Sequence, residues 1–555
     1  MEKLLKNTTI VVTALVLLCG YIFFFQLGKL ALTDPDETFY AQTAKEMTLR
    51  NEWITPYLYG KPQFEKPILF YWLVEASFKA FGVNEFSARL PSAIFGTIGV
   101  IAVFFLGSLL FNRTAGFLSA LILATNIEYV ILSRACITDM VLFVLLLLSA
   151  LFFLCGYIKK KGYFYLLSSL TIALVTLTKG PIYPALFGFA AILSLLLAGD
   201  LKALKRVPWW QSALIFIAVA APWYAAIYKL HGKAFIDGFF GFHNVNRFLV
   251  SEHKIGSQFY YNIPVMFGGM FPWSVFLPVG FWHIFRKIRS RRRGGSGEGK
   301  AGPIFLLAWF AVIFGFFTIS STKLPTYIFP CFISLAVIAG VLLADFAGGG
   351  TSTSVAKGVR ISFYLLIFIM LFGWIGGAAY AKADFPSITR GVIISGLFIA
   401  FGAILSLAAF RAGKFIAAFM LIAYAMILFL YPVSVFLLPD IERYETSKEI
   451  AEKLIVYMKP GEKLGCESNH LAGLAYYTGI FPADIDRHHH MVQLLGSKER
   501  VWAVMKEKNH KQLYDPVINK DYVEPSYMVY KIGKRAIVTN RMPSGGEYIL
   551  KRERP

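Results

Sequence analysis

The sequence predicts an all-α polytopic membrane protein with about 13 transmembrane helices, followed by a small C-terminal α/β domain. Only 16% of its 555 residues are charged and 57% are hydrophobic, whereas a soluble domain carries about 25% charged residues. Apolar runs of about 20 residues, the length that a helix needs to cross a bilayer, recur along the chain. The excess of basic residues, a formal net charge of +22, collects between these runs. An ordinary soluble protein is therefore excluded.

Thirteen apolar runs are long enough to be spans. They lie at residues 8–28, 89–111, 114–132, 138–158, 162–178, 181–198, 208–229, 259–285, 303–320, 325–344, 359–380, 391–410 and 415–436. The first run is longer than the apolar region of a signal peptide, and no small-residue cleavage site follows it. We therefore expect an uncleaved signal-anchor.

The short basic loops fall on one side of the membrane when the spans alternate in direction. They include the run Lys159-Lys160-Lys161 and the cluster from Arg286 to Arg293. The positive-inside rule then puts the N-terminus in the cytoplasm and the C-terminal domain on the outer side. Because the Arg-rich cluster lies between two spans, we interpret it as a topology signal in contact with membrane lipids. No nucleic-acid partner is expected.

Two regions are predicted. A membrane region, 1–439, has long outer loops at 29–88 and 230–258, and a soluble outer domain covers 440–555. Helical spacing of apolar residues predicts two interfacial helices in the first loop, in the segments PDETFYAQTAKEMTLRNEW and LFYWLVEASFKAFG. In the tail we expect one amphipathic helix in IERYETSKEIAEKLIVYMK and strands in RVWAVMK, YMVYKI and RAIVTN.

Polar residues of catalytic types collect in the outer loops and at the outer ends of spans. They are Asp34, Asp36, Glu37, Glu65, Lys66, Arg134, Asp139, Lys179, His243, Arg247, His253, Lys323 and Tyr327. A transporter or flippase of lipid-linked sugars, the alternative from another class, would instead carry charges within its spans and internal repeats. Carboxylates serve as bases or metal ligands, and Lys, Arg and Tyr bind phosphate. The pattern favours chemistry on a lipid-linked phosphate at the outer membrane boundary.

Several of these residues lie in segments that resemble a known family. The segments are DETFYAQTAKEM, FEKPILFYWL, Arg134 to Asp139, LTKGP, HNVNRF with His253 after it, and TKLPTYIFP. In order and spacing they resemble the aminoarabinose (4-amino-4-deoxy-L-arabinose) lipid A transferase branch of the membrane glycosyltransferases with a C-type (GT-C) fold. Protein O-mannosyltransferases are more distant relatives. The resemblance covers residues 8 to 340.

The resemblance implies an inverting glycosyltransferase of the bacterial inner membrane. Such an enzyme moves a sugar from polyprenyl (undecaprenyl) phosphate to lipid A, lipopolysaccharide or another envelope acceptor at the periplasmic face. A protein O-mannosyltransferase-like enzyme, with a Ser or Thr acceptor, stays open as an alternative. A scaffold without catalysis, in which the tail is a binding module, is a third hypothesis.

The resemblance also assigns roles. Asp36 matches the candidate general base, with Glu37 beside it, and Asp34 is the other candidate for the base. The family's lipid-phosphate groups match Lys66, Arg247 and Tyr327, while Asp139 would hold Lys66 in place. Supporting electrostatic roles in donor binding fall to Arg134, Lys179 and Lys323. The resemblance also associates Glu65, with either His243 or His253, with a divalent metal ion. A site without a metal stays open as the alternative, because two ligands are few for a structural metal, which normally takes four.

Overall fold

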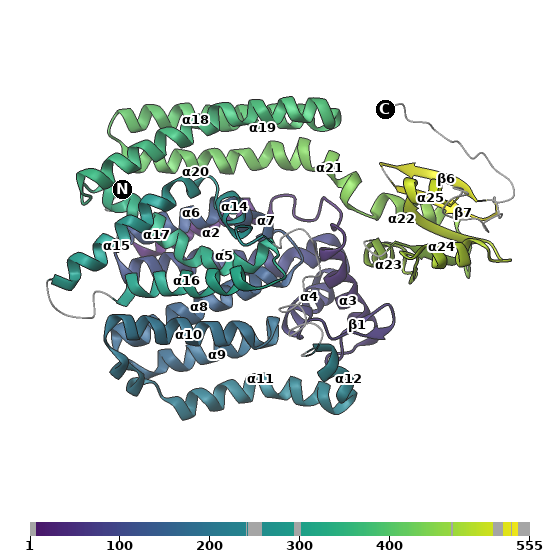
Figure 1. Ribbon diagram of the computed structural model, residues 1–555, viewed down its shortest axis with the longest axis horizontal. Helices are drawn as coiled ribbons and strands as arrows, with labels where there is room; N and C mark the ends of the chain where they lie inside the picture. The colour runs from purple at the N-terminus through teal and green to yellow at the C-terminus, as the bar shows by residue number, and fades with distance from the viewer. Residues whose placement is uncertain are drawn as a thin grey trace. The chain divides into compact units, whose positions relative to one another are not determined.

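The computed structural model describes residues 7–239, 241, 258–293, 301–467, 470–513, 526–533 and 535–541. The chain folds into two compact units, and each unit combines segments that are distant in sequence (Figure 1). The membrane unit comprises Met1–Leu27, Phe64–Leu73 and Arg89–Phe436. The second unit, called the outer unit after the side that the loop charges predict for it, comprises Gly28–Gln63, Val74–Ala88 and Leu437–Pro555.

The membrane unit is built of apolar helices. They are α2 (Thr8–Phe24), α5 (Glu85–Leu110), α6 (Arg113–Thr125), α7 (Ile127–Ser133), α8 (Thr138–Lys159), α9 (Gly162–Lys179), α10 (Ile182–Ala198), α11 (Trp209–His231), α12 (Lys233–Phe235), α14 (Asn262–Gly269), α15 (Leu277–Arg293), α16 (Ala301–Ile319), α17 (Phe332–Ala347), α18 (Thr353–Asp384), α19 (Thr389–Arg411) and α20 (Phe415–Pro432), with 3-10 turns η1 (Leu201–Arg206), η3 (Trp273–Phe276), η5 (Pro325–Cys331) and η6 (Pro386–Ile388).

Nine helices among the described residues are long and apolar enough to cross a membrane, and up to eleven if each of two bent pairs is one span. The helices α2 and α10 are apolar but shorter, at 17 residues each. The predicted fold class, an all-α membrane protein with a small α/β domain, is confirmed. Helices cover all thirteen expected runs, but the count of thirteen spans stays a prediction.

Two of the expected straight spans are bent. The run 114–132 forms α6 and α7 with a 67° bend, because Asn126 between them has extended backbone and its side chain accepts from the Tyr129 N–H. The run 259–285 is bent by 112° between α14 and the helical segment that starts at Trp273, next to Pro272. The indole of Trp273 donates to Thr125 Oγ1 at 3.0 Å, so the two breaks contact each other.

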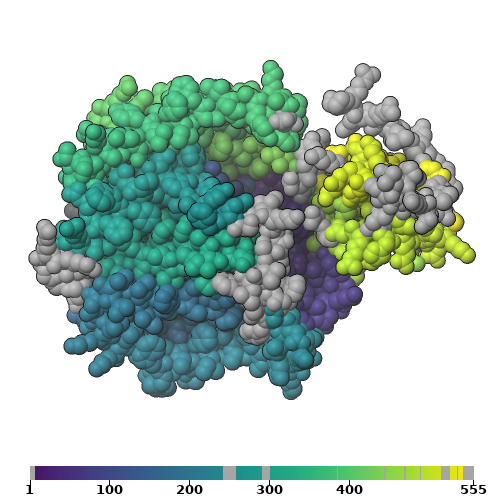
Figure 2. All heavy atoms as spheres, in the orientation of Figure 1, coloured from purple at the N-terminus to yellow at the C-terminus, as the bar shows by residue number. Residues whose placement is uncertain are grey.

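Small residues allow close helix packing in the membrane unit. A Cβ added to Gly340 of α17 would lie 2.7 Å from the Ser119 nitrogen of α6. On the visible face of this unit, the residues of α9 to α11 (blue) lie at one side and those of α18 and α19 (green) at the other, with teal residues between them (Figure 2).

The outer unit contains residues of the first outer loop and of the tail. From the loop come α3 (Asp36–Arg50), the hairpin of β1 (Tyr57–Leu58) and β2 (Lys61–Pro62), and the second half of α4 (Leu69–Phe81). From the tail come α21 (Leu438–Glu445), α22 (Lys448–Tyr457), β3 (Lys463–Cys466), α23 (Leu471–Thr478), β4 (Ala483–Asp484), α24 (His488–Leu495), β5 (Val501–Lys506), α25 (Glu507–Gln512), β6 (Tyr527–Ile532) and β7 (Arg535–Thr539).

The tail forms a five-stranded mixed sheet in the order β4-β3-β5-β7-β6. Strand β3 pairs in parallel with β4 and β5, while β7 pairs antiparallel with β5 and β6. Apolar residues of β3, β5 and β7 pack against α22 and α23 on one face, as Leu454 and Trp502 illustrate. The three strands that the apolar patterns predict are found as β5, β6 and β7.

One predicted helix of the tail is interrupted. The structure ends α21 at Glu445 and begins α22 at Lys448, since Thr446 has extended backbone, with φ −126° and ψ 157°. The single amphipathic helix predicted across this segment was therefore wrong. The domain boundary between residues 439 and 440 stays a prediction, and the loop residues 28–63 and 74–88 share a compact unit with the tail.

Candidate active site

The two adjacent acidic residues at the start of α3 have different environments. Asp36, the first residue of the helix, is exposed. Glu37 is only 3% exposed, and its carboxylate accepts hydrogen bonds from the Thr33 N–H and hydroxyl, both at 3.0 Å. Glu37 therefore fixes the turn before the helix, whereas Asp36 presents its carboxylate at the surface of the outer unit.

Asp34, the other candidate for the base, is enclosed. Its side chain is 1% exposed and accepts from Thr38 Oγ1 at 2.8 Å. The Ser447 hydroxyl donates to the same carboxylate, and His470 Nδ1 lies 3.2 Å from Asp34 Oδ2. A carboxylate so enclosed holds structure in place, and the geometry favours Asp36 as the base.

In the membrane unit, three predicted donor-site residues lie together. Lys179 Nζ, at the end of α9, donates to Asp139 Oδ1 of α8 at 2.7 Å, and both side chains are nearly buried, at 11% and 9% exposed. The same ammonium lies 5.7 Å from the ring centre of Tyr327 and 5.9 Å from that of Tyr183. These residues form a cluster of one ammonium, one carboxylate and two tyrosine rings at one end of the helices. Tyr183 was missed by the sequence reasoning, although it follows Lys179 by four residues.

Glu65 and Lys66 form a second pair in the membrane unit. Lys66 Nζ lies 2.9 Å from Glu65 Oε1, with side chains 14% and 26% exposed. The described residues hold no cluster of three or more His, Cys, Asp and Glu side chains that fits a metal ion. The predicted ligands His243 and His253, and the phosphate ligand Arg247, lie outside the described residues. The metal thus stays a prediction, and no chemical step is derived through it.

Two predicted donor-site cations bind the backbone. The Arg134 guanidinium donates to the carbonyls of Ile22 at 2.9 Å and Phe25 at 2.8 Å, which satisfies acceptors at the end of α2. Lys323 is 6% exposed and donates to the Ser320 carbonyl at 2.8 Å. These contacts are structural, and a role of either residue in donor binding stays a prediction.

Burial alters the chemistry of two groups in the outer unit. It raises the pKa of the Cys466 thiol well above its ordinary value, and the nearby Asp34 carboxylate raises it further. Burial likewise raises the pKa of Glu75, which the neighbouring Lys79 only partly offsets. Because the thiolate is the reactive form of cysteine, Cys466 is inert packing rather than a nucleophile.

Known proteins resemble this chain in sequence and fold. Residues 65–225 match the family described as dolichyl-phosphate-mannose-protein mannosyltransferase. An undecaprenyl phosphate-alpha-4-amino-4-deoxy-L-arabinose arabinosyl transferase of Erwinia tasmaniensis is 28% identical over 65% of this chain and 66% of its own length. Its counterpart in Pectobacterium atrosepticum is 30% identical over 68% of this chain and 65% of its own length.

A crystal structure of ArnT from Cupriavidus metallidurans bound to undecaprenyl phosphate matches the fold over 97% of this chain and 99% of that one. The TM-score is 0.80 and the sequence identity 20%. The chain thus resembles aminoarabinose transferases in sequence and shares the fold of ArnT. This finding confirms the resemblance stated from the sequence. The sequence alignments span just under two thirds of the length of the two arabinosyl transferases.

Proposed function

We propose that the protein is an inverting glycosyltransferase that moves a sugar from a polyprenyl phosphate to an envelope acceptor, with lipid A as the leading candidate. The observation that carries this is the pairing of an exposed carboxylate, Asp36, with a fold that matches ArnT along nearly its whole length. The arabinosyl transferases above are named for an undecaprenyl-phosphate sugar. Their similarity supports the same class of donor here.

In this proposal Asp36 accepts the proton of the acceptor hydroxyl or phosphate as that oxygen attacks the anomeric carbon. The bond from this carbon to the polyprenyl phosphate oxygen breaks in the same displacement, so the anomeric configuration inverts. A positioned general base contributes about 10²- to 10⁴-fold to such a step.

Lipid phosphate leaves as an anion, and positive charge stabilises it. In the cluster of Asp139, Lys179, Tyr183 and Tyr327, the ammonium and phenol groups are donors of the kind that stabilise a developing phosphate charge. The Asp139 carboxylate holds the ammonium of Lys179 and neutralises part of its charge when no donor is bound. Lys66 and Arg247 belong to the proposal as further phosphate ligands.

The proposal includes a location in the membrane and an accessory divalent ion. The protein lies in the bacterial inner membrane, with its N-terminus cytoplasmic and its outer unit periplasmic, as the loop charges predict. A divalent ion bound by Glu65 with His243 or His253 would serve as an accessory. Metal content that does not change in the purified Glu65→Gln variant would remove this ion from the proposal.

A second function is favoured by the match of residues 65–225 to the mannosyltransferase family. In that case the donor chemistry is unchanged, and the acceptor is a Ser or Thr hydroxyl of an envelope protein. The two functions differ only in the acceptor, which is lipid A or another envelope glycolipid in the first and a protein in the second.

Deletion of the gene, with complementation by wild type or Asp36→Asn, tests the proposal. Mass spectrometry of lipid A, lipopolysaccharide and envelope glycoproteins is the measurement. We expect one sugar-sized mass to disappear on deletion, to return with wild type and to stay below 1% of wild type with Asp36→Asn, because the base is lost, a cost of roughly 10²-fold or more.

Glu452→Gln is the matched control, because Glu452 is an exposed acid on α22 of the same unit. It should restore the mass fully. A mass on lipid A supports the first function and a mass on a protein the second. Full restoration by Asp36→Asn would contradict the assignment of the base.

A further inference from the structure

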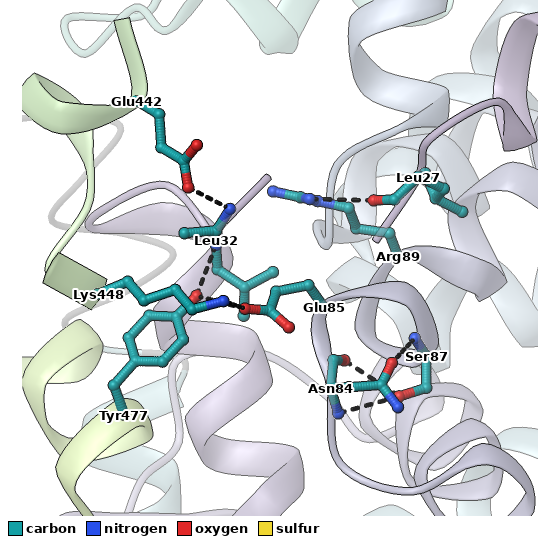
Figure 3. Close-up of polar contacts among 10 residues, drawn as sticks. Leu27, Leu32, Asn84, Glu85, Ser87, Arg89, Glu442, Lys448 and Tyr477 are labelled. Atoms are coloured by element: carbon teal, nitrogen blue, oxygen red, sulfur yellow. Dashed lines mark hydrogen bonds and ion pairs between the residues drawn. The ribbon is translucent and has the colours of Figure 1, made fainter. Parts of the chain in front are cut away.

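The tail contacts the short segment that precedes the candidate base. Residues 31–34 run from the end of the first span region to α3, whose first residue is Asp36. Two of their backbone N–H groups donate to side chains of the tail. The Ala31 N–H donates to Glu442 Oε1 at 2.7 Å, and the Leu32 N–H donates to Tyr477 Oη at 2.8 Å (Figure 3).

Asp34 adds a third attachment. Its carboxylate is bonded by Ser447, in the break between α21 and α22, and faces His470, the residue before α23. The approach is close at Gly473, where an added Cβ would lie 2.2 Å from Asp34 Oδ1. Glycine is therefore required at position 473 if Asp34 is to keep this place.

Two further contacts join the tail to the residues of the first loop around this segment. Lys448 of α22 pairs with Glu85 at 2.7 Å, and Figure 3 shows this pair beside Tyr477. Lys45, further along α3, donates to the Tyr476 carbonyl at 2.6 Å. Groups from α21, α22 and α23 thus hold the chain before Asp36 and the helix that begins with it.

Asp34 also occupies a particular place in the sheet domain. Strand β3 ends at Cys466, and α23 follows it. The carboxyl ends of parallel strands are where open α/β sheets usually bind ligands. In this domain that edge receives a carboxylate of the same chain, since Asp34 lies near enough to Cys466 to raise the pKa of its thiol.

We propose that the C-terminal domain is a positioning element for catalysis, which fixes Asp36 through its contacts with residues 31–34. The inference rests on the proposed function, because it requires Asp36 to be the base. Tyr477, Ser447, His470 and Gly473 are positioning residues in this account, and none of them touches substrate. A misplacement of about 1 Å in a reacting group costs about 10²-fold in rate.

Gly473→Ala in the full-length protein is the main test. Turnover is measured in detergent with undecaprenyl phosphate-aminoarabinose and lipid A as probe substrates, together with binding of undecaprenyl phosphate and the melting temperature. We expect kcat to fall about 10- to 100-fold while the donor KM changes less than about twofold. Gly188→Ala is the control, since its added Cβ meets nothing within 4 Å in α10, and it should keep the wild-type kcat.

The double variant Asp36→Asn/Gly473→Ala separates positioning from general damage. If Gly473 acts through Asp36, the double variant turns over no more slowly than Asp36→Asn alone, because coupled residues are not additive. An additive further loss would overturn the proposal, as would a wild-type kcat in Gly473→Ala. Wild-type turnover in Asp36→Asn would instead overturn the assignment of Asp36 as the base, on which this inference rests.

His470 provides a second route if Gly473→Ala does not fold. His470→Asn keeps a donor near the position of Nδ1, whereas His470→Ala removes it. We expect His470→Asn to retain at least half of kcat and His470→Ala to lose about tenfold, with donor KM unchanged in both. Equal kcat values in the two variants would contradict positioning through Asp34.

Discussion

The membrane unit and the outer unit are held by polar contacts of different range. In the membrane unit the pair Asp139–Lys179 joins α8 to the next helix along the chain, α9, and the bond from Trp273 to Thr125 spans 148 positions. In the outer unit the hydrogen bonds of Ala31 and Leu32 reach residues 411 and 445 positions away. The outer unit therefore depends on contacts between segments that lie much farther apart in the chain than those joined in the membrane unit.

Solvent exposure adds to this difference. Two lysine–carboxylate pairs have the same N–O distance of 2.7 Å, Lys179–Asp139 in the membrane unit and Lys448–Glu85 in the outer unit. The first pair is nearly buried, while the Lys448 side chain is 37% exposed. The two pairs have the same N–O distance, but loss of the nearly buried pair should lower the free energy of unfolding more than loss of the exposed one. Substitutions in each pair can test this difference.

The largest effect on stability is expected in the membrane unit. Asp139→Asn leaves the Lys179 ammonium nearly buried without its carboxylate, which costs about 3 kcal/mol of unfolding free energy. Thermal denaturation of the purified protein in detergent measures this, with the exposed Asp237 changed to Asn as the control. A melting temperature equal to that of the control would show that water reaches the pair.

A smaller effect is expected inside the sheet domain. The pKa of Glu462 is lowered, because burial, which raises it, is outweighed by hydrogen bonds from the Lys459 N–H, Trp502 and Arg500. These bonds measure 2.9, 2.6 and 2.7 Å. Glu462→Gln should cost about 1.5–2 kcal/mol at pH 7, the lower part of the range for hydrogen bonds to a charged group.

The pH dependence of this effect follows from its sign. Because the folded pKa lies below the ordinary value of 4.5, the stabilisation is present above that value and is lost as the pH falls through the folded pKa. Hydrogen exchange of β5 at pH 7 and below pH 4 measures it, with Glu499→Gln, an exposed acid, as the control. Equal protection in Glu462→Gln and wild type at pH 7 would refute the prediction.

The smallest effect is expected at the exposed pair of the outer unit. Lys448→Ala removes its bond to Glu85, and such half-exposed pairs contribute about 0.2–1 kcal/mol. The melting temperature should fall slightly at low salt and hardly at all in high salt, with exposed Lys459 changed to Ala as the control. A loss as large as that in Asp139→Asn would erase the distinction drawn between the two units.

The sequence predicted the site unevenly. Asp139, Lys179 and Tyr327 were expected at one membrane boundary, and the structure brings them together. The sequence could not predict that the Glu37 side chain accepts hydrogen bonds from Thr33 while Asp36 stays exposed, because the two residues are adjacent acids with the same local pattern. The helix break at Thr446 and Ser447 was also missed, since an apolar period continues across it.

By itself, the sequence determined the fold class, the apolar helices and the strands of the tail. The length of an apolar run, its helical period and the charge of a loop are local properties of the sequence. Each segment must meet the requirements of the bilayer or the sheet by itself, so these properties can be read from that segment alone. Tertiary structure alone decided that residues 28–63 and the tail form one unit and that Asp34 is enclosed by Ser447, His470 and Gly473. The physical reason is that these contacts satisfy single buried polar groups through partners more than 400 residues away, and such pairing leaves no periodic trace in a chain.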